Sequence, residues 1–399
     1  MHIVTRFINY VKIDTQSDPN STSYPSTKKQ LDLANLLVKE LNEIGVSNVN
    51  LDQFGYVTGV IKGDKTKAKV AFIAHMDTSS DASGKNVSPQ IIKNYDGKDV
   101  KLNENITMSI KDFPNLIQYA GHDMIFTDGT TLLGADDKAG IAIIMDACQK
   151  LINDNNHGDI YIAFTPDEEI GEGVTYFNLD NFKADFAYTL DGDKAGGIEY
   201  ENFNAAGCKI TFNGKGIHPG AAKNKMINAL KLAIEFNSML NPYLTPENTC
   251  GYEGFNHLTD LNGDVANAKS EYIIRNHDID LFNKQKDDFI KIKDYMNEKY
   301  GYECVGLDIK DSYYNMASLL KDKMEIIDIA KKAIKMAGLV PFSTPIRGGT
   351  DGARLTYMGL PTPNLGTGGG NFHGIYEYVS INEMKKTVDI LINIAHLIK

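Results

Sequence analysis

Hydrophobic residues in the first part of the chain recur at two different spacings. After residue 30 they return every third or fourth position, which predicts a first long helix that ends at Gly45. Thr27 and Gln30 match the T-x-x-Q pattern of a capping box, so we expect this helix to begin there. The same spacing returns over residues 136–152, which predicts a second helix.

Short runs of consecutive apolar residues, each ending in polar residues, lie between and after these helices. Runs of this kind are typical of strands that are buried on both faces of a sheet. Three of them occur, in "KVAFIAHMD" (69–77), "GDIYIAFTPDEE" (158–169) and "ADFAYTLDGD" (184–193). Strands that alternate with helices indicate an α/β domain with a mixed, largely parallel sheet flanked by helices.

The hydrophobic pattern changes after about residue 205. Strand patterns at 205–214 and 270–280 are each followed by a helical pattern, at 224–240 and 284–301. Long helical patterns then resume, and the last helix carries an S-x-x-E capping box at its start. We therefore expect a small α+β domain at 206–320, inserted into a larger domain that is split into 1–205 and 321–399.

Composition narrows the class of protein. Of the 399 residues, 42% are hydrophobic and 23% are charged, which is typical of a globular chain with a large core. The formal net charge of −11 argues against nucleic acid or an anionic membrane as a partner. The four cysteines form no C-x-x-C pair, and the chain shows neither a signal-peptide pattern nor a long apolar run. These features predict a cytoplasmic protein.

Candidate ligands for a metal ion follow each of the three apolar runs. In an open parallel sheet, ligands bind beyond the carboxyl ends of the strands. The first run ends in His75 and Asp77, the second in Glu168 and Glu169, and the third in Asp191. The three ends should therefore meet at one edge of the sheet, which is where such a fold builds a crevice.

The histidine and aspartate of "AHMD" should point to the same side of their strand, because side chains alternate along a strand. A metal-bound imidazole usually has its second nitrogen held by a carboxylate or carbonyl, and Asp77 is suited to hold His75 in this way. Taken alone, an H-x-D pattern is more often a capping aspartate beside an incidental histidine.

The two neighbouring glutamates should point to different sides of the strand end. One of them could then bind a metal ion, while the other accepts a proton from the attacking water. A solvated acidic turn is the alternative, but the buried run before Glu168 and Glu169 argues against it. We assign no chemistry to the flanking acids Asp167 and Glu172.

Further candidates lie at a helix start and in two loops. Asp136 and Asp137 open the second predicted helix, where one can cap the helix and the other can bind metal. His373 lies in a glycine-rich loop, where a lone histidine is more often a surface residue than a ligand, and His218 lies in "GIHPG", for which a plain turn before Pro219 is the alternative. Together, two histidines and three carboxylates are sufficient for two metal ions that share one carboxylate.

The order of these motifs resembles a known family. "AHMDTS", "GADDKAG", "TPDEEIGEG", "TLDGD", "HPG", "RGGTDGARL" and "NFHG" follow one another at fitting distances over nearly the whole chain. The chain resembles the co-catalytic di-zinc metallopeptidase family that includes aminoacylase and acetylornithine deacetylase, and within it the tripeptide-aminopeptidase branch. The resemblance implies a zinc-exopeptidase-like catalytic domain, an inserted lid and dimerisation domain, and removal of the N-terminal residue from tripeptides.

The resemblance also implies a role for each candidate residue. Asp136 would bridge two divalent metal ions per subunit, most simply zinc, with cobalt or manganese as alternatives. The other implied roles are these: His75 and Asp191 as ligands of one ion, Glu169 and His373 as ligands of the other, Glu168 as general base, Asp77 as the residue that orients His75, and His218, Arg275 and Arg347 as substrate-binding residues. The active form would be a homodimer through the inserted domain.

Three other functions compete with this reading. A deacylase or carboxypeptidase of the same family would act on N-acyl amino acids and would share the same core motifs. A catalytically dead scaffold would normally have lost ligands, and all of them are present here. A magnesium-dependent phosphoryl-transfer enzyme would suit adjacent acids, but the two histidines favour zinc, cobalt or manganese, and the chain has no P-loop motif.

Overall fold

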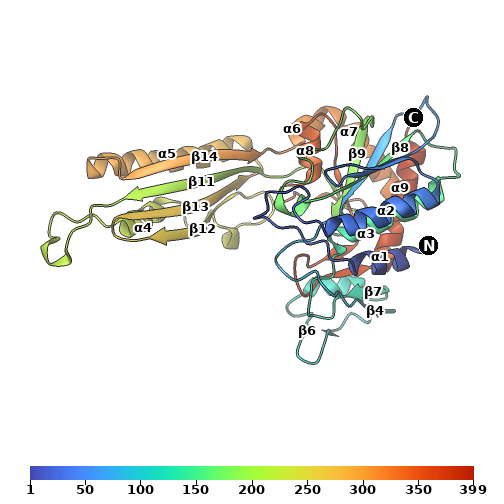
Figure 1. The fold of residues 1–399 in the computed structure, drawn as a ribbon, viewed down its shortest axis with the longest axis horizontal. Coiled ribbons are helices and arrows are strands. Elements are labelled where there is room, and N and C mark those ends of the chain that lie inside the picture. The colour runs from blue at the N-terminus through green and yellow to red at the C-terminus, as the bar shows by residue number, and fades with distance from the viewer. The chain divides into compact units, whose positions relative to one another are not determined.

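The computed structural model describes residues 1–399, and the chain divides into two compact units (Figure 1). The first unit comprises Met1–Tyr200, Leu319–Thr344 and Thr350–Lys399, and the second comprises Glu201–Ser318 and Pro345–Gly349. The short segment Pro345–Gly349, which sequence reasoning left in the larger domain, therefore groups with the second unit. No helix in the structure combines the length and the apolar character that crossing a membrane requires.

A seven-stranded sheet forms the centre of the first unit, and it confirms the predicted mixed, largely parallel sheet. Its strand order is β1-β2-β8-β3-β9-β15-β10, with parallel pairing from β8 through β15 and antiparallel pairing at both edges. The strands span Ser47–Leu51 (β1), Val57–Ile61 (β2), Val70–His75 (β3), Ile160–Thr165 (β8), Phe186–Gly192 (β9), Ile198–Glu199 (β10) and Asn364–Gly366 (β15). Every residue of β3 and β8 is buried, as their unbroken apolar runs predict.

Helices of the first unit cover this sheet. Helix α3 packs against β3, α1 and α9, and nearly all of its residues are buried because small and apolar residues occur on every side of it. The helices span Ile3–Val11 (α1), Gln30–Ile44 (α2), Ala135–Leu151 (α3), Ala317–Leu320 (α6, which crosses the boundary between the units), Met324–Met336 (α7), Asp351–Tyr357 (α8) and Ile381–Leu397 (α9). Ser380 caps α9 by accepting a hydrogen bond from the Glu383 N–H, as predicted.

The capping box predicted at the start of α2 is wrong. Helix α2 begins at Gln30, and Lys29 precedes it without any side-chain cap. The Thr27 hydroxyl donates instead to the backbone carbonyl of Gln16, 2.8 Å away. The Gln30 amide donates to the carboxylate of Asp167 at 2.6 Å and to the Thr27 hydroxyl at 3.3 Å, so its shortest contact is with a distant loop.

A second, smaller sheet in the first unit was not predicted. Its strand order is β16-β17-β7-β4, and its strands are only two or three residues long, which is too short for a hydrophobic period to appear. The strands span Gln90–Ile92 (β4), Met124–Phe126 (β7), Gly369–Gly370 (β16) and Tyr378–Ser380 (β17), beside a separate pair at Val100–Lys101 (β5) and Thr107–Met108 (β6). The loop between β16 and β17 carries His373.

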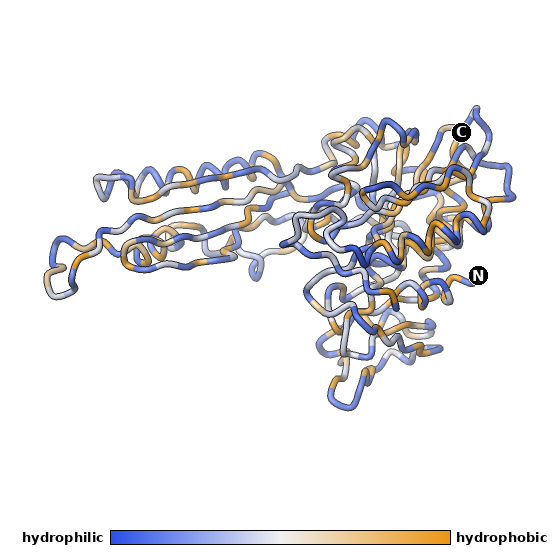
Figure 2. The backbone as a smooth tube through the Cα atoms, viewed as in Figure 1, coloured by the Kyte–Doolittle hydropathy of each residue, from blue (hydrophilic) through white to orange (hydrophobic).

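The second unit is a four-stranded antiparallel sheet packed against two helices. The strand order is β12-β13-β11-β14, and a buried apolar cluster lies between the sheet and helices α4 and α5. Hydrophobic and hydrophilic residues alternate along α5 (Figure 2). The elements span Asn204–Asn213 (β11), Ala229–Met239 (α4), Phe255–Gly263 (β12), Asn267–Asn276 (β13), Ile279–Tyr300 (α5) and Val305–Tyr313 (β14). Strands β12 and β14 were missed: β12 is mostly exposed and polar, whereas Val305, Leu307 and Ile309 of β14 do alternate along the strand and were overlooked.

Candidate metal centre

The carboxyl ends of three neighbouring strands bring the predicted ligands together. Strand β3 ends at His75, β8 ends at Thr165 just before the glutamates, and Asp191 lies near the end of β9. Since β8, β3 and β9 are adjacent and parallel, these ends lie at one edge of the sheet. Asp136 reaches the same place from the first turn of α3.

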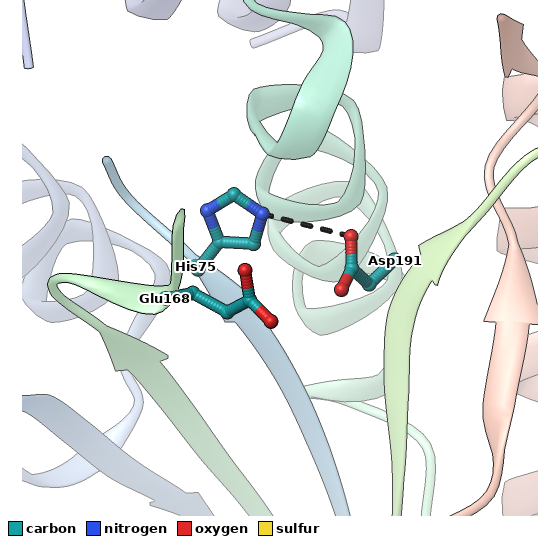
Figure 3. A group of neighbouring side chains, drawn as sticks. All are labelled: His75, Glu168 and Asp191. Atoms are coloured by element: carbon teal, nitrogen blue, oxygen red, sulfur yellow. Dashed lines mark ion pairs between the residues drawn. The ribbon is translucent and has the colours of Figure 1, made fainter. Parts of the chain in front are cut away.

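His75 is held on both of its ring nitrogens. Its Nδ1 lies 3.3 Å from Oδ1 of Asp77, and its Nε2 lies 2.8 Å from Oδ1 of Asp136 and 3.6 Å from Oδ1 of Asp191. Figure 3 shows the contact with Asp191. The imidazole therefore presents Nε2 to two carboxylates, while Asp77 holds the other nitrogen.

The carboxylate of Asp136 lies between two imidazoles. Its Oδ1 contacts His75, and its Oδ2 lies 3.2 Å from Nε2 of His373. The same nitrogen of His373 lies 2.9 Å from Oε2 of Glu169. The neighbouring Asp137 turns away and accepts hydrogen bonds from the backbone N–H groups of Gly140 and His75. The pair of aspartates thus divides into one residue that faces the site and one that secures the backbone.

The two glutamates have different surroundings, although not for the reason expected. Strand β8 ends at Thr165, and Glu168 and Glu169 lie in a short 3-10 turn, Glu168–Ile170. Successive side chains of such a turn point about 120° apart. The Glu168 carboxylate groups with His75 and Asp191 (Figure 3), whereas Glu169 contacts His373.

Asp77 connects the histidine with this turn. Besides its contact with His75, its Oδ1 accepts a hydrogen bond of 2.9 Å from the Glu168 N–H, and its Oδ2 accepts one of 3.1 Å from the Glu169 N–H. One buried carboxylate thus fixes the ring of His75 and the backbone that carries both glutamates.

The acidic groups of the site repel one another in a buried place. Burial raises the pKa of Glu168 well above its usual range, and the charge of Asp191 adds to the shift. Burial also raises the pKa values of Glu169 and Asp191 to about 7, with the charge of Asp136 as a further cause. Hydrogen bonds to Asp136 and Glu169 raise the pKa of His373 to about 11. Positive charge is therefore stabilised at this place, and negative charge is in excess.

A divalent cation fits this donor set. Two overlapping groups each bring three donor atoms within 4.8 Å of one another, namely His75, Glu168 and Asp191, and His75, Asp136 and Glu169. Metal binding would also relieve the repulsion between the carboxylates. Imidazole and carboxylate donors together suit zinc, cobalt or manganese. The residues present could hold two such ions on either side of Asp136.

The three predicted substrate-binding residues lie in the second unit. His218 is exposed, and its Nδ1 accepts a hydrogen bond from the Gly220 N–H. Arg275 is half-buried, and its Nη1 donates to the backbone carbonyls of Ala206 and Ile274.

The guanidinium of Arg347 already has several partners in its own unit. Its Nη1 donates to the backbone carbonyls of Gly251 and Glu253, and its Nη2 donates to the carbonyl and the hydroxyl of Thr249. It also lies over the ring of Phe203, 5.1 Å from its centroid. In this arrangement Arg347 holds the 249–253 loop.

Sequence reasoning missed two carboxylates that support the ligands. Glu377 is buried and accepts hydrogen bonds from the N–H groups of Leu133, Gly134 and Asp136, at 2.6, 2.8 and 3.1 Å. Asp81 is exposed, and its Oδ2 lies 3.4 Å from Nδ1 of His373. Each acid follows a predicted site residue by four positions, Glu377 after His373 and Asp81 after Asp77, and this proximity was the available signal.

Comparison with known proteins identifies relatives over the whole chain. Residues 132–396 match the model of peptidase family M20/M25/M40. A protein named Peptidase T from Clostridium perfringens is 53% identical over 396 residues, which cover 98% of this chain and 98% of that protein.

Solved structures share the fold. The crystal structure of an aminopeptidase, PepT, from Bacillus cereus has a TM-score of 0.79 and 22% identity, over 99% of this chain and 97% of that one. A tripeptidase from Staphylococcus aureus has a TM-score of 0.79 and 20% identity, also over 99% and 97%. The fold is thus shared with known structures. The similarity in sequence to the relative from Clostridium perfringens covers 98% of this chain.

Proposed function

The chain belongs to peptidase family M20/M25/M40, and we propose that it is a metal-dependent aminopeptidase that removes the N-terminal residue from tripeptides. The observation that carries the proposal is the carboxylate of Asp136 between His75 and His373, with Glu168 and Glu169 facing different sides of it. The choice of substrate rests on the similarity to Peptidase T and to the tripeptidase from Staphylococcus aureus.

Two divalent ions, most simply zinc, complete this site in our proposal. His75, Asp136 and Asp191 would hold one ion, and Asp136, Glu169 and His373 would hold the other. When bound, such ions lower the pKa of water and polarise a carbonyl group. The carboxylates and imidazoles would then no longer share their protons with one another.

Glu168 moves the proton in the proposed reaction. Its carboxylate faces the site beside His75 and Asp191, and the proposed ligand sets do not include it. It accepts the proton of the attacking water and delivers it to the nitrogen of the leaving amine, as a general acid–base group does. Asp77 holds both His75 and the turn that carries Glu168, so the base and the ligand keep a fixed spacing.

We further propose that the second unit supplies substrate contacts and the dimer interface, as the resemblance implies. Arg275 is the better placed of the two arginines to bind a substrate carboxylate, because only its Nη1 donates to the protein, whereas Arg347 uses both terminal nitrogens. His218 is exposed and would polarise the scissile carbonyl. A homodimer should have twice the 44.1 kDa mass of the chain in solution, and a monomeric mass for the active enzyme would contradict it.

The substrate proposal is tested with free and blocked peptides of different lengths. The zinc-loaded enzyme should release alanine from Ala-Ala-Ala faster than from the dipeptide or tetrapeptide, and should not cleave the N-acetylated tripeptide. The result that would overturn the proposal is a preference for N-acetyl amino acids, which would identify a deacylase instead.

A further inference from the structure

Asp167, to which the sequence assigned no chemistry, is fully buried beside the two catalytic-site glutamates. Its carboxylate accepts hydrogen bonds from the Ser26 N–H at 2.7 Å, from the Ser26 hydroxyl at 2.5 Å and from the Gln30 amide nitrogen at 2.6 Å. Its backbone has a φ of 55°, in the left-handed region that non-glycine residues seldom adopt. A residue in this conformation persists when its surroundings hold it there.

Gln30 binds Asp167 at two points. Its Nε2 donates to Oδ1 of Asp167, and its Oε1 accepts a hydrogen bond of 3.2 Å from the Asp167 N–H. Gln30 is the first residue of α2 and is fully buried. This two-point contact needs one donor and one acceptor on the same side chain, which only an amide of this length supplies here.

The turn that carries Glu168 and Glu169 is therefore fixed from two directions. The backbone N–H groups of three successive residues donate hydrogen bonds to side chains. That of Asp167 donates to Gln30, and those of Glu168 and Glu169 donate to Asp77. Asp77 follows a strand of the sheet, whereas Gln30 belongs to α2. The same stretch of chain before α2 also holds the far end of the loop, because the Tyr24 hydroxyl donates to the Glu172 carbonyl at 2.8 Å.

We propose that Gln30 is a positioning residue for the peptidase reaction, which acts through Asp167 to fix the turn that carries Glu168 and Glu169. Its side-chain hydrogen bonds go to Ser26, Thr27 and Asp167 and to none of the proposed metal ligands. This inference rests on the proposed function, since it assumes that Glu168 transfers the proton. A displacement of about 1 Å at a reacting group can cost 10²-fold in rate, and loss of residues that orient a site typically costs about 10–100-fold.

The test first removes the side-chain amide of Gln30. It then exchanges the amide and the carboxylate between positions 30 and 167. Gln30→Met keeps the approximate shape and removes both hydrogen bonds to Asp167, together with the longer contacts from Nε2 to the hydroxyls of Thr27 and Ser26 at 3.3 and 3.4 Å. Gln30→Glu places a second carboxylate against Asp167. The double variant Gln30→Glu with Asp167→Asn exchanges the two groups, so that the new amide at 167 can donate to the new carboxylate at 30.

We expect Gln30→Met to lower kcat for Ala-Ala-Ala about 10–100-fold, with KM within about twofold and two zinc ions still bound at saturating zinc. Gln30→Glu should be at least as slow, and the exchanged double variant should recover most of kcat. The matched control is Gln285→Met in the second unit. Gln285 is also buried and also bonded at both amide atoms, to Asn276 and Asn256. This control should lower Tm and leave kcat unchanged.

A wild-type kcat in Gln30→Met would overturn the inference. A loss of kcat that is fully explained by a smaller folded fraction, measured by circular dichroism, would overturn it as well. If Gln30→Met does not fold, the double variant decides, because a double variant as slow as Gln30→Glu would also overturn it. Failure of the proposed function looks different, since the wild-type enzyme itself would then not cleave tripeptides.

Discussion

The two halves of the candidate metal centre, one around His75 and one around His373, offer the same kinds of donor group but are built from different parts of the fold. His75 ends a strand that is buried on both faces, and its side chain is 2% exposed. His373 lies in the loop between two very short strands, and its side chain is 42% exposed. The carboxylates behind them differ in the same way, because Asp77 is fully buried and Asp81 is 69% exposed.

This difference places a rigid, buried half and an exposed half side by side in one site. The His75 half is preorganised by the sheet and by Asp77, so it should bind its ion more tightly and exchange it more slowly. The His373 half is the more exposed one, so solvent can reach its side chains. We therefore expect two binding steps of different affinity, joined through Asp136.

The largest effect is expected where the two halves meet. Asp136→Ala removes the only carboxylate that contacts both histidines, so both ions should be lost and kcat/KM should fall by about 10⁴-fold or more. Metal content per chain and tripeptide turnover would check this, with circular dichroism as the folding control. Two ions still bound tightly in this variant would show that Asp136 is not shared.

Replacing each histidine by alanine in turn tests the two halves separately. His75→Ala should lower kcat/KM by about 10³-fold and deprive the buried Asp77 and the partly buried Asp191 of their contact with the imidazole, whereas His373→Ala should lower it by about 10²-fold. Excess zinc should partly restore the second variant, because water can replace a ligand on the exposed side. The comparison fails if His373→Ala is the more damaging change.

The carboxylates behind the histidines give the smallest and most specific effect. Asp77→Asn should weaken zinc binding about 10–100-fold, because one amide oxygen cannot serve the His75 ring and two N–H groups. Asp81→Asn should change it by less than about 3-fold, since an exposed charge contact contributes little. Competition with a chromophoric chelator measures the zinc affinity of both variants. Equal losses of affinity would contradict the claim that the His75 half is the more rigidly held one.

Sequence reasoning predicted the sheet and the residues at its edge for a physical reason. An unbroken apolar run marks a buried strand, and the rule for strand ends then selects His75, Glu168 and Asp191 without any knowledge of contacts. The resemblance to the family, now confirmed by the comparisons, added the roles of the residues, and these roles stay predictions until the variants are made.

The supporting residues were beyond this reasoning because their contacts join distant parts of the chain. Gln30 matched a local capping pattern, yet its amide bonds to Asp167, 137 positions away. Glu377 binds the backbone of Leu133, Gly134 and Asp136, and its place four positions after His373 marks it as a neighbour of the site without showing these contacts. Strands of two or three residues, and strands with mostly polar exposed residues, gave no hydrophobic period to detect.

The most direct test of the account compares Glu168→Gln with Glu169→Gln, because it asks whether neighbouring glutamates perform two different tasks. Glu168→Gln should keep two zinc ions and lose at least about 10³-fold in kcat, whereas Glu169→Gln should lose one ion. Glu172→Gln, in the same loop but exposed, is the matched control and should retain wild-type turnover. Full tripeptide turnover in Glu168→Gln, or loss of its metal, would contradict the assignment of Glu168 as the base.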